Sequence, residues 1–373
     1  MGKLSKQTIS AQIGNKKCEK TGAVNMPLYF STAYRHTDIG VGTGYDYTRT
    51  ANPTRDVLEE ALAELEDGQF GFATSSGMSA TGLVFTLFKT GDHIISLQDL
   101  YGGTFRYFGT LERQYKIEFS YWNGKDISDL AGFLQANTKA IFIETPTNPL
   151  MQEVDIREVA EFASANHLLL IVDNTFYTPI LQQPLNLGAD IVIHSATKYL
   201  GGHNDILAGA VIVRNEELGA FYAAALNESG EVLSPFDSWL LIRGLKTLPL
   251  RMREHEKNAK RVVQFLREHP LIKEVKYPGQ GGMISFYIED VALISPLLRN
   301  VELFTFAESL GGVESLITYP ATQTHADIPR ELRESYGLTD ELLRISVGIE
   351  DADDLVNDLK SALDLASKEA VRS

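Results

Sequence analysis

The chain has 373 residues, 44% of them hydrophobic, so it is long enough for two domains that each have a core. A formal net charge of −15 argues against nucleic acid or a membrane surface as the main partner, since both would require a basic face. The start of the chain lacks the apolar core of a signal peptide, no apolar run has the length of a membrane span, and a single cysteine fits a reducing compartment, so we expect a cytoplasmic protein.

Residues 1–51 show no strong periodicity and are predicted to form an extended N-terminal arm. Asn52 followed by Pro53 predicts the start of a helix that continues to Glu66. Alternating strand and helix patterns then predict a mostly parallel α/β domain over residues 52–233, with further helices at Gly77–Lys89 and Asp155–Asn166. The expected strands are Phe70–Thr74, His93–Leu97, Ala140–Ile143, Leu168–Val172, Ile191–His194 and Gly209–Val213.

A smaller C-terminal α/β domain is predicted over residues 234–373. It opens with a helical stretch from Pro235 to Glu268, which Pro249 should kink or break. A closing helix begins at Ala352. The expected strands are Met283–Ile288, Leu316–Tyr319 and Leu343–Val347.

Two of the predicted strands turn polar near their carboxyl ends, at Asp173 and at Lys198. Open parallel sheets bind their ligands at this edge. A lysine there can form a Schiff base with an aldehyde cofactor, and an aspartate can keep a pyridine nitrogen protonated, so the pair predicts a pyridoxal phosphate site. The eight histidines show no metal-ligand spacing, and no metal is predicted.

The same cofactor needs a phosphate cradle and a group that holds the face of its ring. Ser76, Gly77 and Met78 stand between a strand and a helix, where backbone amides and a hydroxyl converge on an anion. The hydroxyls that can add to this cradle are those of Ser195 and Thr197, and the side chain placed to stack on the ring is Tyr101.

Seven motifs together resemble the Cys/Met-metabolism family of pyridoxal phosphate enzymes. They occur in the family's order along nearly the whole chain: Tyr47–Thr54, Ser75–Met78, Asp99–Gly103, Glu144–Pro149, Val172–Phe176, His194–Gly202 and Ser309–Ser315. The resemblance implies fold type I, a homotetramer built as a dimer of dimers, and active sites shared between subunits. It implies small amino-acid substrates.

The resemblance also implies roles for the residues around the cofactor. Lys198 is the Schiff-base lysine and shuttles protons, Asp173 pairs with the pyridinium, and Tyr101 stacks on the ring and serves as a general acid or base. Tyr47 and Arg49 would reach the phosphate of the neighbouring subunit's cofactor, which explains functional side chains in an arm without periodicity.

On the substrate side, the resemblance implies that Arg344 grips the α-carboxylate as a bidentate fork, helped by Ser315 and Asn148. Glu314 would anchor the ammonium group of the incoming amino acid.

Three positions bear on the branch of the family. Glu314 stands where γ-synthases and γ-lyases have glutamate and cystathionine β-lyases typically have a bulkier aromatic residue, which favours chemistry at Cγ. Gly103 stands where methionine γ-lyases have cysteine, which argues against that branch, and Asp46 matches the γ-synthase pattern. The short link Tyr277–Met283 resembles compact bacterial enzymes that join O-acetylhomoserine to cysteine. We therefore expect cystathionine γ-synthase chemistry on an O-acylhomoserine, in methionine biosynthesis, with sulfide as a further nucleophile.

Two other interpretations remain open, and a third is disfavoured by the order of its motifs. A cystathionine γ-lyase would use the same residues to eliminate at Cγ, giving cysteine, 2-oxobutanoate and ammonia. A non-catalytic binding protein could share the fold. Ser195–Lys198 also spells the S-x-x-K signature of penicillin-recognising enzymes, but Lys89-Thr-Gly91 precedes it, whereas K-T-G should follow it.

Overall fold

The computed structural model describes residues 4–370 and divides the chain into two compact units, each made of two stretches of chain. The first unit contains residues up to 89 and residues 156–249, and the second contains residues 90–155 and those from 250 onward. Residues 1–3, which begin the predicted arm and the stretch that lacks a signal-peptide core, lie outside the described part, as do 371–373. The domain limits after residues 51 and 233 stay predictions.

In the first unit the strand order is β1-β7-β6-β5, in which β5 and β6 run parallel while β7 is antiparallel to both of its neighbours. The strands are β1 (Phe70–Thr74), β5 (Leu169–Asp173), β6 (Ile191–His194) and β7 (Gly209–Val213). The helices are α1 (Lys6–Gln12), α2 (Pro53–Glu66), α3 (Gly77–Phe85), α5 (Ile156–Ala165), α6 (Thr178–Leu181), α7 (Pro184–Leu187), α8 (Glu216–Ser229) and α9 (Pro235–Leu245).

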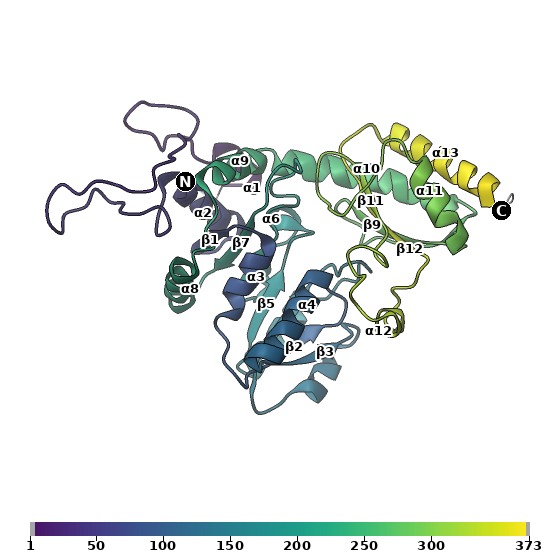
Figure 1. Cartoon of the computed structure of the whole chain (residues 1–373), viewed down its shortest axis with the longest axis horizontal. Helices are drawn as coiled ribbons and strands as arrows, with labels where there is room; N and C mark the ends of the chain where they lie inside the picture. The colour runs from purple at the N-terminus through teal and green to yellow at the C-terminus, as the bar shows by residue number, and fades with distance from the viewer. Residues whose placement is uncertain (1–3, 371–373) are drawn as a thin grey trace. The chain divides into compact units, whose positions relative to one another are not determined.

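Helices pack on these strands and bury them. α2 contacts β1 and β7 (Figure 1). α3 contacts β6 and β7, and α5 contacts β5. Every residue of β6 and β7 is buried, as expected of strands covered on both faces. α2 begins as predicted, because Asn52 Oδ1 accepts hydrogen bonds from the amides of Thr54 (2.9 Å) and Arg55 (3.4 Å).

In the second unit, the first stretch of chain forms strands in the order β4-β2-β3, all parallel. Its strands are β2 (His93–Leu97), β3 (Glu118–Trp122) and β4 (Thr138–Glu144). Its helical segments are α4 (Gly102–Thr110), a π-helical turn at Leu111–Tyr115 and a 3₁₀ segment at Ile127–Phe133.

The later stretch of the second unit forms a smaller sheet of five strands in the order β10-β11-β12-β9-β8. Its strands are β8 (Ile272–Lys276), β9 (Met283–Ile288), β10 (Thr305–Phe306), β11 (Leu316–Thr318) and β12 (Leu342–Ser346). Its helical segments are α10 (Leu248–Glu268), which begins at the end of the first unit, a 3₁₀ segment at Val291–Leu293, α11 (Ile294–Asn300), α12 (Arg330–Ser335) and α13 (Ala352–Ala370). α11 and α13 lie side by side (Figure 1), and one apolar core joins both to α10, β9 and β12.

The structure confirms the expected break in the long helical stretch and adds two elements in the arm that the sequence did not predict. The break in the long helical stretch is confirmed, since α9 ends at Leu245 and α10 begins at Leu248 with Pro249 in its first turn. The arm contains α1, which has no strong sequence pattern, and an antiparallel bridge between Ala33 and Tyr47. Among residues 4–370, no helix combines the length and apolarity that crossing a bilayer requires.

Candidate functional site

Lys198 lies in a compact turn that follows strand β6. Its amide donates to the carbonyl of Ser195 (3.1 Å), and its own carbonyl accepts from the amide of Gly202 (2.8 Å). Gly202 has a φ of +73°, which glycine adopts without steric cost. The turn therefore has a fixed backbone at the carboxyl end of a buried strand, as the sequence predicted for this lysine.

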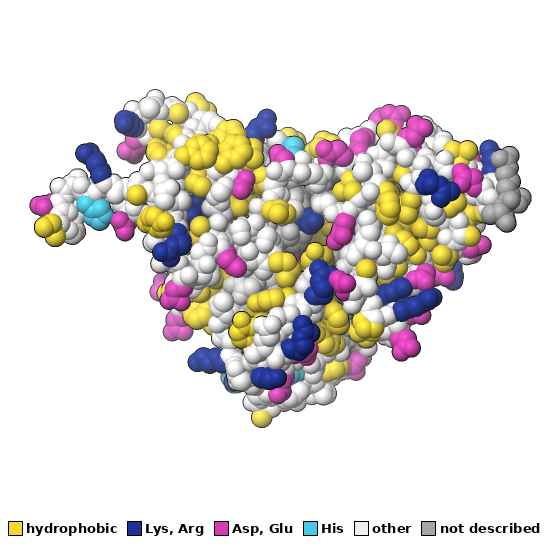
Figure 2. Space-filling model, in the orientation of Figure 1, with side chains coloured by type: hydrophobic (Ala, Val, Ile, Leu, Met, Phe, Trp, Pro, Cys, Tyr) yellow, Lys and Arg dark blue, Asp and Glu magenta, His cyan; other side chains and the backbone are white. Residues whose placement is uncertain are grey.

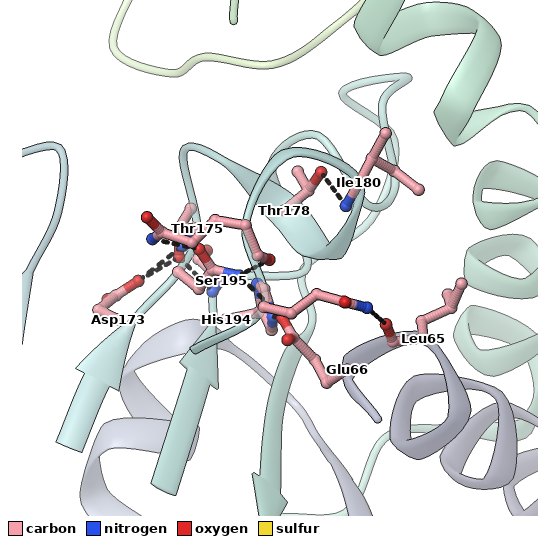
Figure 3. Close-up of polar contacts among 11 residues, drawn as sticks. Leu65, Glu66, Asp173, Thr175, Thr178, Ile180, His194 and Ser195 are labelled. Atoms are coloured by element: carbon pink, nitrogen blue, oxygen red, sulfur yellow. Dashed lines mark hydrogen bonds and ion pairs between the residues drawn. The ribbon is translucent and has the colours of Figure 1, made fainter. Parts of the chain in front are cut away.

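Asp173 and Ser195, at the ends of the neighbouring strands β5 and β6, are connected through Thr175 (Figure 3). The Thr175 hydroxyl donates to Asp173 Oδ1 (2.6 Å) and accepts from the amide of Ser195 (2.8 Å). The Thr175 amide donates to the same carboxylate oxygen (3.0 Å). One threonine thus fixes the carboxylate of Asp173 against the backbone of Ser195.

Burial raises the pKa of Asp173 above its ordinary value, while the two hydrogen bonds from Thr175 and the proximity of His194 act in the opposite direction. A buried carboxylate is costly without a cation beside it. The site therefore favours a cationic group next to Asp173, and a protonated pyridine nitrogen is such a group.

Helix α3 begins at the carboxyl end of β1, and its first amides belong to Gly77 and Met78. Ser76 caps the helix by accepting from the amide of Ser79 (3.0 Å). The first amides of a helix have no carbonyl acceptor within that helix, and the helix dipole favours an anion there. A Cβ on Gly77 would lie 2.8 Å from Ser195 Oγ, so the absence of a side chain brings these amides next to that hydroxyl.

Thr197 lies between Ser195 and Lys198, and its hydroxyl bonds to a single neighbour. Thr197 Oγ1 donates to the carbonyl of Ala208 (3.1 Å) and accepts from its amide (3.0 Å). The proton of this hydroxyl is thus used by the backbone, whereas Ser195 and Ser76 carry the hydroxyls beside Gly77. The predicted phosphate contact of Thr197 stays a prediction.

Glu66 and His194 form a buried pair beside this site that the sequence analysis missed (Figure 3). His194 Nε2 lies 2.6 Å from Glu66 Oε1, and both side chains are 1% exposed. Asn174 Nδ2 donates to the same oxygen (2.9 Å). Glu66 closes α2 and His194 closes β6, 128 positions apart, so only the folded chain reveals the pair.

Tyr47 and Arg49 lie on the exposed arm, held by contacts within the first unit. The Arg49 guanidinium lies 5.7 Å from the centre of the Tyr47 ring and donates to Asn227 Oδ1 (3.1 Å). Buried Arg55 donates to the carbonyls of Thr48 (2.8 Å) and Arg49 (3.2 Å). Their predicted reach into a neighbouring subunit stays a prediction.

In the second unit, Tyr101 precedes the first turn of α4, and its amide donates to Glu144 Oε2 (2.9 Å). Burial, and then the charge of Glu308, raise the pKa of Tyr101 above its ordinary value. The ring lies against the backbone of Gly103, where a Cβ would come within 2.4 Å of Tyr101 Cε1. Glycine at position 103 therefore sets where the tyrosine ring can lie.

Arg344 and Asn148, both predicted to bind substrate, are in direct contact. Arg344 is buried on β12 and donates from one terminal nitrogen to Asn148 Oδ1 (2.9 Å). Its other terminal nitrogen donates to the Ser309 carbonyl (3.2 Å) and to Thr318 Oγ1 (3.3 Å). These three oxygens fix the plane of the guanidinium, which is the group that a bidentate carboxylate contact requires.

Ser315 and Glu314 are neighbours in the chain but differ in exposure to solvent. Glu314 is exposed. Ser315 is fully buried; its hydroxyl donates to Glu350 Oε2 (3.0 Å) and accepts from the amide of Gly348 (2.8 Å). Glu350 also accepts from the Ser315 amide (2.6 Å), a partner that the sequence analysis missed. The predicted contact of Ser315 with substrate stays a prediction.

The family model for Cys/Met metabolism PLP-dependent enzymes matches residues 7–364. The chain belongs to this family. It is 57% identical, over 96% of both chains, to cystathionine gamma-synthase/O-acetylhomoserine (thiol)-lyase of Bacillus subtilis (strain 168). It is 48% identical to cystathionine gamma-lyase of the same organism, over 97% of this chain and 100% of that relative.

A solved structure of cystathionine gamma synthase from Xanthomonas oryzae pv. oryzae, in complex with cystathionine, is also similar. It superposes with a TM-score of 0.96 at 40% identity, covering 98% of this chain and 99% of that one. The predicted fold class, with a large, mostly parallel sheet and a smaller one, is thereby confirmed. The enzyme's cofactor is pyridoxal 5′-phosphate, as its family uses.

The residues of the first unit fit this cofactor by their chemistry. A phosphate suits the amides of Gly77 and Met78 and the hydroxyls of Ser76 and Ser195. A ring nitrogen that carries a proton suits the half-buried carboxylate of Asp173, whose pKa burial raises. These groups occupy the ends of β1, β5 and β6, so both charged ends of the cofactor find a partner of opposite charge or dipole.

Proposed function

We propose that the enzyme catalyses γ-replacement, joining an O-acylhomoserine, with O-acetylhomoserine as the preferred ester, to L-cysteine to give L-cystathionine. The observation that carries the proposal is the 57% identity, along nearly the whole chain, with a relative named for this synthase and thiol-lyase activity. The relative named as a γ-lyase is less similar, at 48%. Glu314 and Gly103, which favour Cγ chemistry outside the methionine γ-lyases, are consistent with this assignment.

Within this proposal, Lys198 holds the aldehyde end of the cofactor, and Asp173 holds its ring nitrogen. Ser76, Gly77, Met78, Ser195 and Thr197 bind its phosphate, and Tyr101 lies on its ring. When bound, pyridoxal phosphate supplies an electron-accepting ring that stabilises negative charge at the substrate Cα. Asp173 supports this chemistry because a carboxylate next to the ring nitrogen favours the protonated, electron-poor form of the ring.

The substrate is bound and deprotonated by side chains of the chain itself. Arg344 binds the α-carboxylate, with Asn148 fixing the plane of the guanidinium. The Lys198 amine removes the proton from the substrate Cα and then moves a proton at Cβ, and Tyr101 assists as a general acid or base. Ser315 supports this pocket, and Glu314 receives the ammonium group of the incoming cysteine.

The replacement breaks one bond at Cγ and forms another. The Cγ–O bond of the ester breaks, and acetate leaves with the bonding electrons. The sulfur of cysteine forms a new bond to Cγ, and the thiol proton is released. Sulfide can take the place of the thiol, which would give homocysteine.

A cystathionine γ-lyase is the second candidate, favoured by the 48% identity with the relative of that name. The same residues would break the Cγ–S bond of cystathionine without a replacing thiol. Water would then release 2-oxobutanoate and ammonia, with cysteine as the third product.

The deciding experiment supplies purified holoenzyme with O-acetylhomoserine plus cysteine, and separately with cystathionine alone, and identifies the products by mass spectrometry. The proposal is supported if the first mixture forms cystathionine faster than the second mixture consumes it. If the second mixture gives cysteine and 2-oxobutanoate while the first forms no cystathionine, the enzyme is a γ-lyase. Lys198→Ala should abolish turnover in both mixtures and the visible absorption of the bound cofactor.

We also propose that the enzyme is a homotetramer in which the arm of one subunit serves the site of another. Hydrophobic side chains are exposed on the face in Figure 2. The exposed hydrophobic side chains of the first unit include Val24 (78% exposed) and Phe30 (70%), and the Phe30 ring stacks on Phe236, which is 46% exposed. Exposed aromatic side chains on the unit that carries Tyr47 and Arg49 suit a surface that a second copy covers.

Mixing two inactive variants tests the sharing of sites. Lys198→Ala and Arg49→Ala each inactivate their own homo-oligomer in this proposal. After denaturation and refolding together, about a quarter of the sites would contain both native residues if pairing is random and Arg49 acts across the interface. Recovery of activity toward that level supports sharing, whereas no recovery in a mixture that has reassembled places Arg49 in its own subunit's site.

A further inference from the structure

His325 is a buried histidine in the second unit, in a segment that the sequence analysis left unassigned. Its side chain is fully buried, and Nε2 lies 3.0 Å from the carbonyl oxygen of Asn148 and 3.3 Å from that of Leu100. Nδ1 lies 2.7 Å from the hydroxyl oxygen of Thr324. The ring therefore touches three polar groups from three segments of chain.

These contacts determine which nitrogen carries the proton. Both neighbours of Nε2 are carbonyl oxygens, which only accept, so Nε2 must be the donor. Burial, and next the nearby charge of Arg344, lower the pKa of His325 to about 4, so the ring is neutral near pH 7. A neutral ring with its proton on Nε2 accepts at Nδ1, and the Thr324 hydroxyl is then the donor.

The two carbonyls belong to the segments that carry two proposed functional side chains. Leu100 directly precedes Tyr101. Asn148 accepts from Arg344 through Oδ1 and from His325 through its backbone oxygen. A single N–H thus bridges the Tyr101 segment and the partner of Arg344.

The start of α4 packs closely on the histidine segment. A Cβ on Gly102 would lie 2.1 Å from the Thr324 carbonyl oxygen, so glycine is needed for this approach. Thr324 therefore contacts α4 through its backbone while its hydroxyl orients His325. The ring has little freedom to move away from the two carbonyls.

We propose that His325 is a positioning residue that holds the Tyr101 segment and the Asn148–Arg344 pair in a fixed relation, and so sets both the binding of the substrate carboxylate and the rate of proton transfer. It does not touch the substrate itself. The proposal rests on the roles given above to Arg344 and Tyr101. If this is so, activity requires an N–H donor at the position of Nε2, between the carbonyls of Leu100 and Asn148, and does not require the imidazole ring itself.

Two substitutions separate the donor from the ring. In His325→Gln the amide nitrogen reaches the place of Nε2, whereas in His325→Asn it reaches only the place of Nδ1. We expect the glutamine variant to retain most of the wild-type kcat and KM. The asparagine variant should lose about tenfold or more in kcat/KM for O-acetylhomoserine, with a raised KM and a lowered kcat, because the two carbonyls lose their shared donor.

Controls keep this result interpretable. His269→Asn, on a ring that packs against Phe265 at 5.4 Å, should show wild-type kinetics. Thermal unfolding and cofactor absorption should show that both His325 variants fold and bind cofactor. Equal losses in the glutamine and asparagine variants would overturn the proposal, as would wild-type kinetics in the asparagine variant.

A measurement without turnover tests the same idea. In ¹⁵N-histidine-labelled holoenzyme, the NMR signals of His325, assigned by their loss in the glutamine variant, should report a proton on Nε2 with no titration near neutral pH. A proton on Nδ1 would overturn the proposal even in an active enzyme. Arg344→Lys supplies the separate check: a KM unchanged by that substitution would refute the role of Arg344 in the proposed function, while the NMR result on His325 would stand.

Discussion

Tyr101 can lie against the backbone at position 103 because glycine leaves the space for its ring. The closest ring atom would be 2.4 Å from a Cβ, a separation at which either the ring or the backbone must move. The family resemblance places cysteine at this position in methionine γ-lyases. A larger residue there would therefore shift the tyrosine and change the pocket, which links a specificity position to a specific steric contact.

Gly103→Ala should displace the Tyr101 ring and lower kcat/KM for O-acetylhomoserine by about tenfold or more, since small misplacements of catalytic groups are costly. The change should also shift the absorption spectrum of the bound cofactor. Gly132→Ala, in the same unit, is the matched control because a Cβ there meets no atom within 4 Å. Wild-type kinetics in both variants would show that the ring position does not matter.

The residues that sequence reasoning predicted share a local signal, and the ones it missed do not. Asp173 and Lys198 each end an apolar run, so their chemistry can be read from a few neighbouring letters. His325, Glu66 and Glu350 owe their roles to partners far away in the chain, such as Asn148, which is 177 positions from His325. A buried polar side chain leaves no pattern in its own segment, so only the folded structure shows what it contacts.

At the scale of elements, the strands that the sequence analysis did not predict are all edge strands of their sheets. β3 follows β2 at one end, and β8 and β10 are the two edges of the smaller sheet. β3 begins with an exposed glutamate, and β8 contains two exposed charged residues. Edge strands avoid continuous apolar runs because an exposed apolar edge invites aggregation. The interior strands, in contrast, were predicted to within two residues of their ends.

The pair between α2 and β6 should make a large contribution to stability. Glu66→Ala removes the acceptor of both His194 and Asn174 in a place where the Glu66 side chain is 1% exposed. Leaving a buried hydrogen-bonding group without its partner costs about 1–3 kcal/mol for each such group. Glu64→Ala, on an exposed position of the same helix, should change the free energy of unfolding by only about 0.5 kcal/mol. Urea unfolding of both variants measures the difference, and similar midpoints would contradict the expectation.

At the scale of the whole molecule, buried titratable groups give the stability a pH dependence with opposing parts. Burial lowers the pKa of His255 to about 4. Burial raises the pKa of Asp99 to about 6 and that of Glu59 to about 7. Between about pH 6.5 and 4 the unfolded chain binds the proton that native His255 does not, so this histidine makes the protein less stable as pH falls. The two carboxyls act in the opposite sense, because the native forms hold their protons at higher pH.

A variant isolates the histidine's part. His255 Nδ1 lies 2.7 Å from the Val347 carbonyl, and the amide of asparagine in His255→Asn can make the same bond without titrating. Below about pH 6.5, the stability of the wild type relative to the variant should fall by up to about 1.4 kcal/mol per pH unit. Chemical unfolding of both proteins at about pH 7 and about pH 5 checks this. A constant difference would mean that His255 titrates alike in both states.

The interrupted course of the chain also matters while the protein is being made. Residues 90–155 belong with residues from 250 onward, yet the segment 156–249 emerges from the ribosome between them. At ribosomal rates of about 5–20 residues per second, the earlier stretch waits roughly 5–20 seconds for its partner. During synthesis its parallel strands β2, β3 and β4 are therefore complete before the later strands and helices of their own unit exist.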